Sequence, residues 1–157
     1  MKKIFLLLLL SCGSIAAGQL DQKVRGFIDS AKVGDLAAVT EFFYASVSRE
    51  AWLDTLKPMF PMLQNGSFKM RPTGKELVLG RFAVVLIQLE SGESKLQKFQ
   101  EFYFELIDGK WTMHPCESPS DIEGISERAT PDELIHLELM TDWVGLMTEL
   151  LEIRDEK

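Results

Sequence analysis

The sequence predicts an α+β fold, in which N-terminal helices precede a curled antiparallel sheet and one long helix follows it. Three observations carry this prediction. Apolar residues recur with helical spacing before residue 65, and they alternate with polar residues in runs between 67 and 114. From residue 130 onward, a strong helix-start signal precedes a long amphipathic stretch.

Three helices are expected before residue 65. Gly34 offers a stop for the first helix, and Asp35 can cap the second. Ser48 can cap the third, which Pro58 and Pro61 break into a short irregular continuation. The apolar faces consist of Leu20, Val24, Phe27, Ile28 and Ala31 in the first helix, Leu36, Val39, Phe42 and Phe43 in the second, and Trp52, Leu53 and Leu56 in the third.

The strands are expected over a short run at 68–70, a long run at 77–89 with a bulge at Gly80, and a third run at 96–107. Residues 82–87 are apolar on both faces, which predicts a strand covered on both sides. Asp108-Gly109 is a strong hairpin signal, after which residues 111–114 pair back. In the third strand, one face has Phe102, Phe104 and Leu106, and the other has Phe99, Tyr103 and Ile107.

The C-terminal part is expected to contain a solvated acidic linker at 116–129 and an amphipathic helix within 130–157. Thr130 can cap this helix, Pro131 suits its first position, and Glu133 completes a capping box. The helix stripe consists of Leu134, Leu137, Met140, Val144, Met147 and Leu151 and is expected to pack as core. Leu139 and Trp143 widen it, so a second, intermolecular contact surface is the alternative.

The first 18 residues have the features of a secretory signal peptide: Lys2 and Lys3, an apolar run, and small residues before Gln19. Cleavage before Gln19 is the expected processing step. The alternative is lipidation of Cys12, because the residues before it resemble a lipobox, although Leu10 is bulky where a small residue is commoner. Either route predicts an exported protein, periplasmic or secreted. Lipidation of Cys12 would make it lipid-anchored.

Charge and cysteine content limit the function classes. Removal of residues 1–18 leaves 15 Lys and Arg against 24 Asp and Glu, a net charge of −9. An acidic chain without a basic block is a poor match for nucleic acid. No second apolar run approaches the roughly 20 residues of a transmembrane helix. Cleavage leaves Cys116 as the only cysteine, so no intramolecular disulfide is expected.

Three stretches resemble the nuclear transport factor 2-like superfamily, which includes polyketide-cyclase-like and ketosteroid-isomerase-like proteins: KVRGFIDSAKVGDLAAVTEFF, RFAVVLIQLE and FYFELIDGKWTMHP. The resemblance covers residues 20–115 and implies a domain at 19–115 in which the sheet wraps around the helices as a cone. The mouth of such a cone often holds a small apolar ligand. The resemblance implies a pocket lined by Phe43, Tyr44, Trp52, Phe102, Phe104 and Trp111.

Catalysis in this fold needs a polar pair inside an apolar pocket, such as a carboxylate beside a tyrosine or histidine. The weak candidates are Tyr44, Asp54, Tyr103 and His114. A rim tyrosine, a solvated carboxylate, a packed tyrosine and a strand-end histidine are the favoured roles of these four. No carboxylate is expected in the apolar centres of the strands, which counts against catalysis.

Metal and thiol chemistry are also disfavoured. His114, Cys116 and His136 are too few and too scattered for a zinc site. Pro115 extends the chain between the first two, and a reactive thiol needs a neighbouring base. The acids of the expected linker, Glu117, Asp121, Glu123 and Glu127, lack the spacing of a calcium loop.

The sequence therefore predicts an exported, non-catalytic domain without a cofactor, which binds a small apolar ligand or a protein partner of the cell envelope. The first alternative is an isomerase or hydrolase that uses Tyr44, Tyr103 or His114 with a carboxylate. The second is a homodimeric assembly subunit that pairs through the sheet or the final helix.

Overall fold

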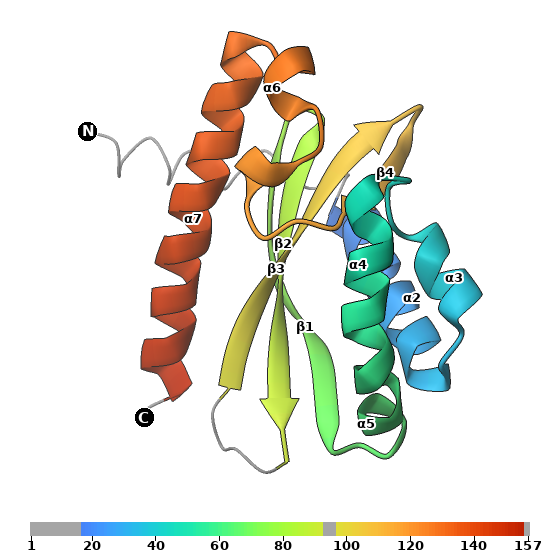
Figure 1. Ribbon diagram of the computed structural model, residues 1–157. Helices are drawn as coiled ribbons and strands as arrows, with labels where there is room; N and C mark the ends of the chain where they lie inside the picture. The colour runs from blue at the N-terminus through green and yellow to red at the C-terminus, as the bar shows by residue number, and fades with distance from the viewer. Residues whose placement is uncertain (1–16, 93–96, 156–157) are drawn as a thin grey trace.

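The structure is a computed structural model that describes residues 17–92 and 97–155. It has three layers: helices α2 to α5 cover one face of a four-stranded antiparallel sheet, and α7 covers the other face (Figure 1). The predicted α+β class is confirmed. No helix among the described residues is long and apolar enough to cross a membrane. The predicted signal sequence up to residue 16, and Cys12 within it, lie outside the described residues.

The helical layer follows the predicted order. Asp35 caps α3 as expected, since its Oδ1 accepts a hydrogen bond from the Ala38 N–H at 3.0 Å. The next helix begins at Val47, before the predicted cap Ser48, because Ser46 takes the extended cap conformation. The helix bounds are α2 Ala17–Val33, α3 Leu36–Glu41, α4 Val47–Leu56, η1 Lys57–Met59 and α5 Phe60–Gln64.

The sheet differs from the prediction in its first half. The strands pair in chain order and are β1 Phe68–Leu79, β2 Phe82–Ser91, β3 Gln97–Ile107 and β4 Lys110–His114. The predicted long strand over 77–89 is therefore wrong: Gly80, with φ of 61°, lies in a tight turn that pairs Leu79 with Phe82. The irregularity lies instead between Pro72 and Lys75. Proline has no N–H for the ladder, so the register shifts there.

Two other predictions for the sheet are confirmed. Residues 82–87 of β2 are all buried, because this strand lies between β1 and β3 and both of its faces are covered. Asp108 and Gly109 form the predicted two-residue turn, with φ values of 50° and 75°. Residues Phe102 and Phe104 of β3 face the helical layer, whereas Tyr103 faces α7.

Two hydrophobic cores lie on opposite sides of the sheet. The inner core joins the sheet to the helices and includes Phe27, Phe43, Phe102, Phe104, Trp111 and Met113. The outer core joins it to α7 (Pro131–Asp155) and includes Leu77, Phe82, Val84, Leu86, Tyr103, Cys116, Ile122, Ile125, Leu137, Met140 and Trp143.

The segment expected to be a solvated linker packs on the sheet instead. It contains η2 (Pro119–Asp121) and α6 (Ile125–Arg128), and they lie beside the upper part of α7 in Figure 1. Ile122 and Ile125 are buried in the outer core, while the acidic side chains around them, Asp121, Glu123 and Glu127, are exposed. The acidic composition of this segment therefore describes its outer surface only, and two isoleucines anchor it.

Candidate functional site

The residues predicted to line a pocket are mostly packed in the inner core. Phe43, Phe102, Phe104 and Trp111 are buried there, and the partly buried Trp52 packs against them. Phe27 of α2 meets the rings of Phe43 and Phe102 edge to face, with centroid distances of 5.7 and 5.3 Å. Such contacts are a favourable aromatic geometry.

The centre of the inner core is closed to solvent. Phe27 and Phe104 are 0% exposed. A cavity beside either ring that could admit one water molecule would leave part of that ring accessible. The space in front of the sheet is therefore filled at this depth by the side chain of Phe27 itself.

Tyr44 is separate from the other predicted pocket residues. Residues 42–44 follow the edge of β4, where the Tyr44 N–H donates to the Met113 carbonyl at 2.7 Å. The Tyr44 ring lies 4.9 Å from the ring of His114, centroid to centroid. His114 pairs with Tyr103 across β3 and β4, so both belong to the face that α7 covers. Asp54 is exposed and pairs with Lys57 at 2.6 Å.

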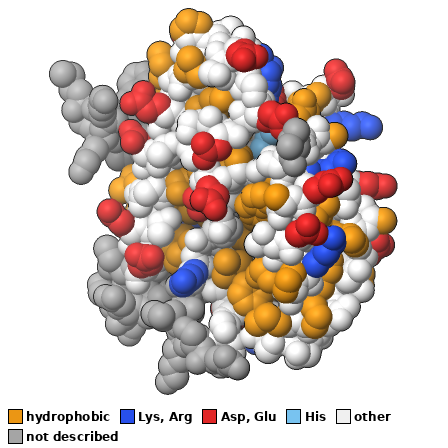
Figure 2. All heavy atoms as spheres, in the orientation of Figure 1, with side chains coloured by type: hydrophobic (Ala, Val, Ile, Leu, Met, Phe, Trp, Pro, Cys, Tyr) orange, Lys and Arg blue, Asp and Glu red, His pale blue; other side chains and the backbone are white. Residues whose placement is uncertain are grey.

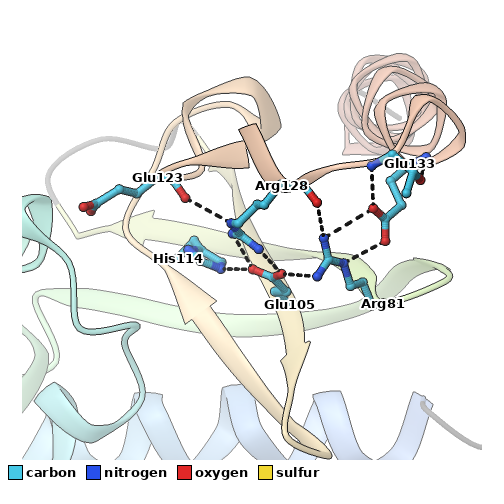
Figure 3. A network of polar contacts seen from close by, with 7 residues as sticks. Arg81, Glu105, His114, Glu123, Arg128 and Glu133 are labelled. Atoms are coloured by element: carbon cyan, nitrogen blue, oxygen red, sulfur yellow. Dashed lines mark hydrogen bonds and ion pairs between the residues drawn. The ribbon is translucent and has the colours of Figure 1, made fainter. Parts of the chain in front are cut away.

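A buried carboxylate lies on that same face, which contradicts the prediction that the strand centres contain none. Glu105 of β3 is 1% exposed. Its Oε2 lies 2.9 Å from His114 Nε2 (Figure 3). Glu105 thus brings together β3 and β4 through polar side chains in an otherwise apolar layer.

Two arginines compensate the buried charge of Glu105. Arg128, the last residue of α6, makes a bidentate pair: Nη2 donates to Oε2 at 2.7 Å and Nη1 donates to Oε1. Arg81, from the turn between β1 and β2, places its Nη1 3.3 Å from Oε1. Bidentate arginine–carboxylate pairs are among the strongest hydrogen-bonded contacts in proteins.

The network continues to the first turn of α7. Arg81 Nε lies 2.8 Å from Oε1 of Glu133. Glu133 also accepts the Thr130 N–H at 2.8 Å and returns its own N–H to Thr130 Oγ1 at 3.3 Å, which is the predicted capping box. We call Arg81, Glu105, His114, Arg128 and Glu133 the outer-face network. It connects β3, β4 and the turn between β1 and β2 to α6 and α7 (Figure 3).

The protonation states in the network follow from burial and pairing. Burial alone would raise the pKa of Glu105, but the hydrogen bonds and charge of Arg128, aided by His114, hold that pKa below its ordinary value. Burial lowers the pKa of His114, against the opposing influence of Glu105. At neutral pH, a neutral His114 therefore donates its Nε2–H to an ionised Glu105. Both carboxylate oxygens are occupied by internal donors.

The remaining candidate groups are protonated and buried. Burial is the main cause that raises the pKa of Cys116, to about 12, and it also raises the pKa of the Tyr103 hydroxyl. A thiol in that state is not a nucleophile at neutral pH. Among the described residues, no three His, Cys, Asp or Glu side chains gather into a group that could hold a metal ion.

The sequence contained one indication of which face of the sheet Glu105 lies on. The alternation of β3 places Glu101 and Glu105 on the same face as Tyr103, the face that the structure shows to be covered by α7. Coverage of both faces was predicted for the central strand, but the packing of residues 116–129 over the sheet was not, because this segment was expected to be a solvated linker.

No protein-family model matches this chain, and no curated protein matches its sequence. The chain is similar to an NTF-2 like protein of unknown function from Shewanella oneidensis, with a TM-score of 0.48, 17% identity, and coverage of 64% of this chain and 98% of that one. It is also similar to an NTF2-like protein of unknown function from Cytophaga hutchinsonii, with a TM-score of 0.41, 13% identity, and coverage of 62% and 88%.

A third similar structure is an LEH-like epoxide hydrolase from M. tuberculosis, with a TM-score of 0.38, 16% identity, and coverage of 62% of this chain and 82% of that one. The first two bear the name of the superfamily that the sequence resembles. These likenesses concern the arrangement of helices and strands, and none of them transfers an activity to this chain.

Proposed function

We propose that the mature chain is an exported, non-catalytic domain that binds a protein partner in the cell envelope through the outer surface of α7. The observation that carries this proposal is a row of large apolar side chains on α7 that solvent reaches. Ile135, Leu146 and Leu150 are 53%, 39% and 52% exposed and share one side of the helix. Clusters of this kind on one face of a helix are typical of contact surfaces.

Two observations disfavour the alternatives. An apolar ligand inside the cone would need space that the ring of Phe27 fills. An enzyme would need a base that can reach a substrate, whereas Glu105 is 1% exposed and gives both oxygens to Arg128, with His114 and Arg81 beside them. The network's chemistry is therefore internal, and the surface is left as the place of contact.

Export is supported by the position of the expected cleavage site. Gly18 and Gln19 are exposed in the first turn of α2, while Leu20 is fully buried. Cleavage before Gln19 would keep every described core residue in the mature chain. Mass spectrometry of the N-terminus from the natural host tests this: a start at Gln19 supports cleavage, a lipidated Cys12 supports the anchored form, and an intact Met1 overturns export.

Site-specific photocrosslinking tests the contact surface. Benzoylphenylalanine placed at Ile135 or Leu146, in protein made by the natural host, should give a covalent adduct with another chain. The same group at Val33, which is 72% exposed on the opposite layer, is the matched control and should give none. Adducts at Val33 alone, or at none of the three positions, would overturn the proposal.

A further inference from the structure

We infer that the outer surface of α7 takes a cationic amphipathic helix of its partner, one with Lys or Arg beside a row of apolar side chains. This inference rests on the proposed function, because it names the chemistry of the partner that binds at the same surface.

The apolar half of the surface has the spacing of a helix-binding stripe. Ile135, Leu139, Leu146 and Leu150 are separated by four, seven and four residues, which places them along one side of α7. Leu139 is partly buried and continues the stripe into the outer core. The stripe is about 22 Å long, the length of roughly four helical turns. A partner helix with apolar residues at similar spacing can pack along it.

The polar half of the surface has one sign of charge. Glu138, Asp142 and Glu149 are exposed, and Asp142 lies four residues before Leu146 on the same side of the helix. Residues 131–152 include no Lys or Arg. Among the described residues, the ion pairs of α7 involve Glu133, at the far end of the helix. Figure 2 shows acidic side chains beside apolar ones over the part of the surface that α7 forms.

This charge pattern selects one class of occupant. A second copy packed on the same stripe would bring Asp142, at the middle of the stripe, close to its own counterpart, and like charges at short distance oppose docking. An anionic lipid surface would be repelled for the same reason. A helix with Lys or Arg beside its apolar row can pack that row on the apolar stripe and place its positive charges near the acidic side chains.

Synthetic helices of about 20 residues provide the probe. One has a leucine row flanked by lysines, the second keeps the leucines with glutamates in place of the lysines, and the third is a scramble of the first with no apolar face. Binding to the mature chain is measured by fluorescence anisotropy at low and high NaCl. The cationic amphipathic peptide should bind at least about tenfold tighter than the other two, and salt should weaken it.

Variants localise the binding. Leu146→Gln and Leu150→Gln should each weaken the cationic peptide roughly fivefold to tenfold, and Asp142→Lys and Glu149→Lys roughly threefold or more. Val33→Gln and Glu41→Lys are matched controls, since both residues are exposed in the helical layer on the other side of the sheet. Equal losses in the controls, or no loss in the α7 variants, would overturn the inference.

The two proposals fail in different ways. If crosslinks form at Leu146 but the cationic peptide does not compete with them, or if the captured segment is acidic, the inference fails and the contact surface stands. An adduct of twice the chain mass identifies a second copy and also overturns the inference. If no crosslink forms at Ile135 or Leu146 while the peptide binds, the proposed function fails.

Discussion

The buried carboxylate of Glu105 is contacted by three donor side chains that come from three different parts of the chain. Arg81 lies in the first hairpin, His114 ends the last strand, and Arg128 ends α6. A buried charge without partners would be too costly to keep, whereas a fully paired one holds its surroundings in a single arrangement. At the scale of the residue, the carboxylate is thus a structural connection, and its removal leaves two arginines facing an apolar layer.

Glu105→Gln should lower the free energy of unfolding by about 3 kcal/mol, because it breaks a buried pair on one side only. The measurement is denaturant unfolding followed by circular dichroism. Glu138→Gln, an exposed glutamate on α7, is the control and should change stability by less than about 0.5 kcal/mol. Similar midpoints for both variants would contradict the structural role of Glu105.

His114 should make stability depend on pH between about 7 and 5. Its pKa in the folded chain is lowered by burial, so the unfolded chain, with a histidine pKa of about 6.5, binds more protons in this range. Stability is therefore full well above the unfolded-state pKa of about 6.5 and declines as the pH falls through and below that value. Glu105, whose pKa is also lowered, adds a second decline below about pH 4.3.

Unfolding measured in urea across this pH range tests the assignment. His114→Gln keeps an N–H for Glu105 but cannot titrate, so the slope between pH 7 and 5 should disappear. His136→Gln is the matched control, as His136 is the only other histidine, and it should retain the slope. A slope that survives in His114→Gln would assign it to another group.

At the scale of the element, the first turn of α7 is held from both sides. Thr130 and Glu133 satisfy each other's backbone N–H groups, and the same Glu133 carboxylate meets Arg81 of the network. The helix start and the outer face of the sheet are therefore one connected unit.

Thr130→Ala should cost about 1 kcal/mol, the usual contribution of a helix cap. Thr141 is an exposed threonine within the same helix and is not a cap, so Thr141→Ala should be neutral or slightly stabilising. Thermal unfolding of both variants provides the comparison. Equal losses would show that the cap makes no special contribution.

Gly80→Ala should destabilise the first hairpin by about 1–2 kcal/mol, because a Cβ is disfavoured in the left-handed conformation. The added atom would also meet His136 Nδ1 at 3.4 Å. Gly145→Ala is the control, since its Cβ meets nothing within 4 Å and the residue is helical, so it should stabilise by up to about 1 kcal/mol. Chemical denaturation distinguishes the two signs, and a neutral Gly80→Ala would argue against the turn.

At the scale of the whole molecule, local signals were predictable and long-range pairings were not. Asp108-Gly109 specifies a hairpin by its own backbone preferences, and Thr130 with Glu133 specifies a helix start. Gly80 is compatible with either a bulge or a turn, and only the pairing of Leu79 with Phe82 decides between them. Burial of Glu105 depends on Arg128, 23 residues further along the chain, so neither the network nor the packed segment before α7 could be deduced from periodicity.

The outer core makes α7 part of the domain, which separates two ideas about this helix. If α7 were an appendage, a chain of residues 19–129 would fold and remain monomeric. In the structure its loss would uncover Phe82, Val84 and Leu86, each 0% exposed, and would remove Glu133 from Arg81. Exposure of buried leucine- or phenylalanine-sized side chains costs about 1.5–3 kcal/mol each, comparable in sum with the whole stability of a small domain.

We therefore expect residues 19–129 to be unfolded or aggregated by circular dichroism and sedimentation, while residues 19–157 unfold cooperatively as a control. A cooperative, monomeric 19–129 chain would place α7 outside the domain, and its exposed stripe would then belong to a separate binding arm.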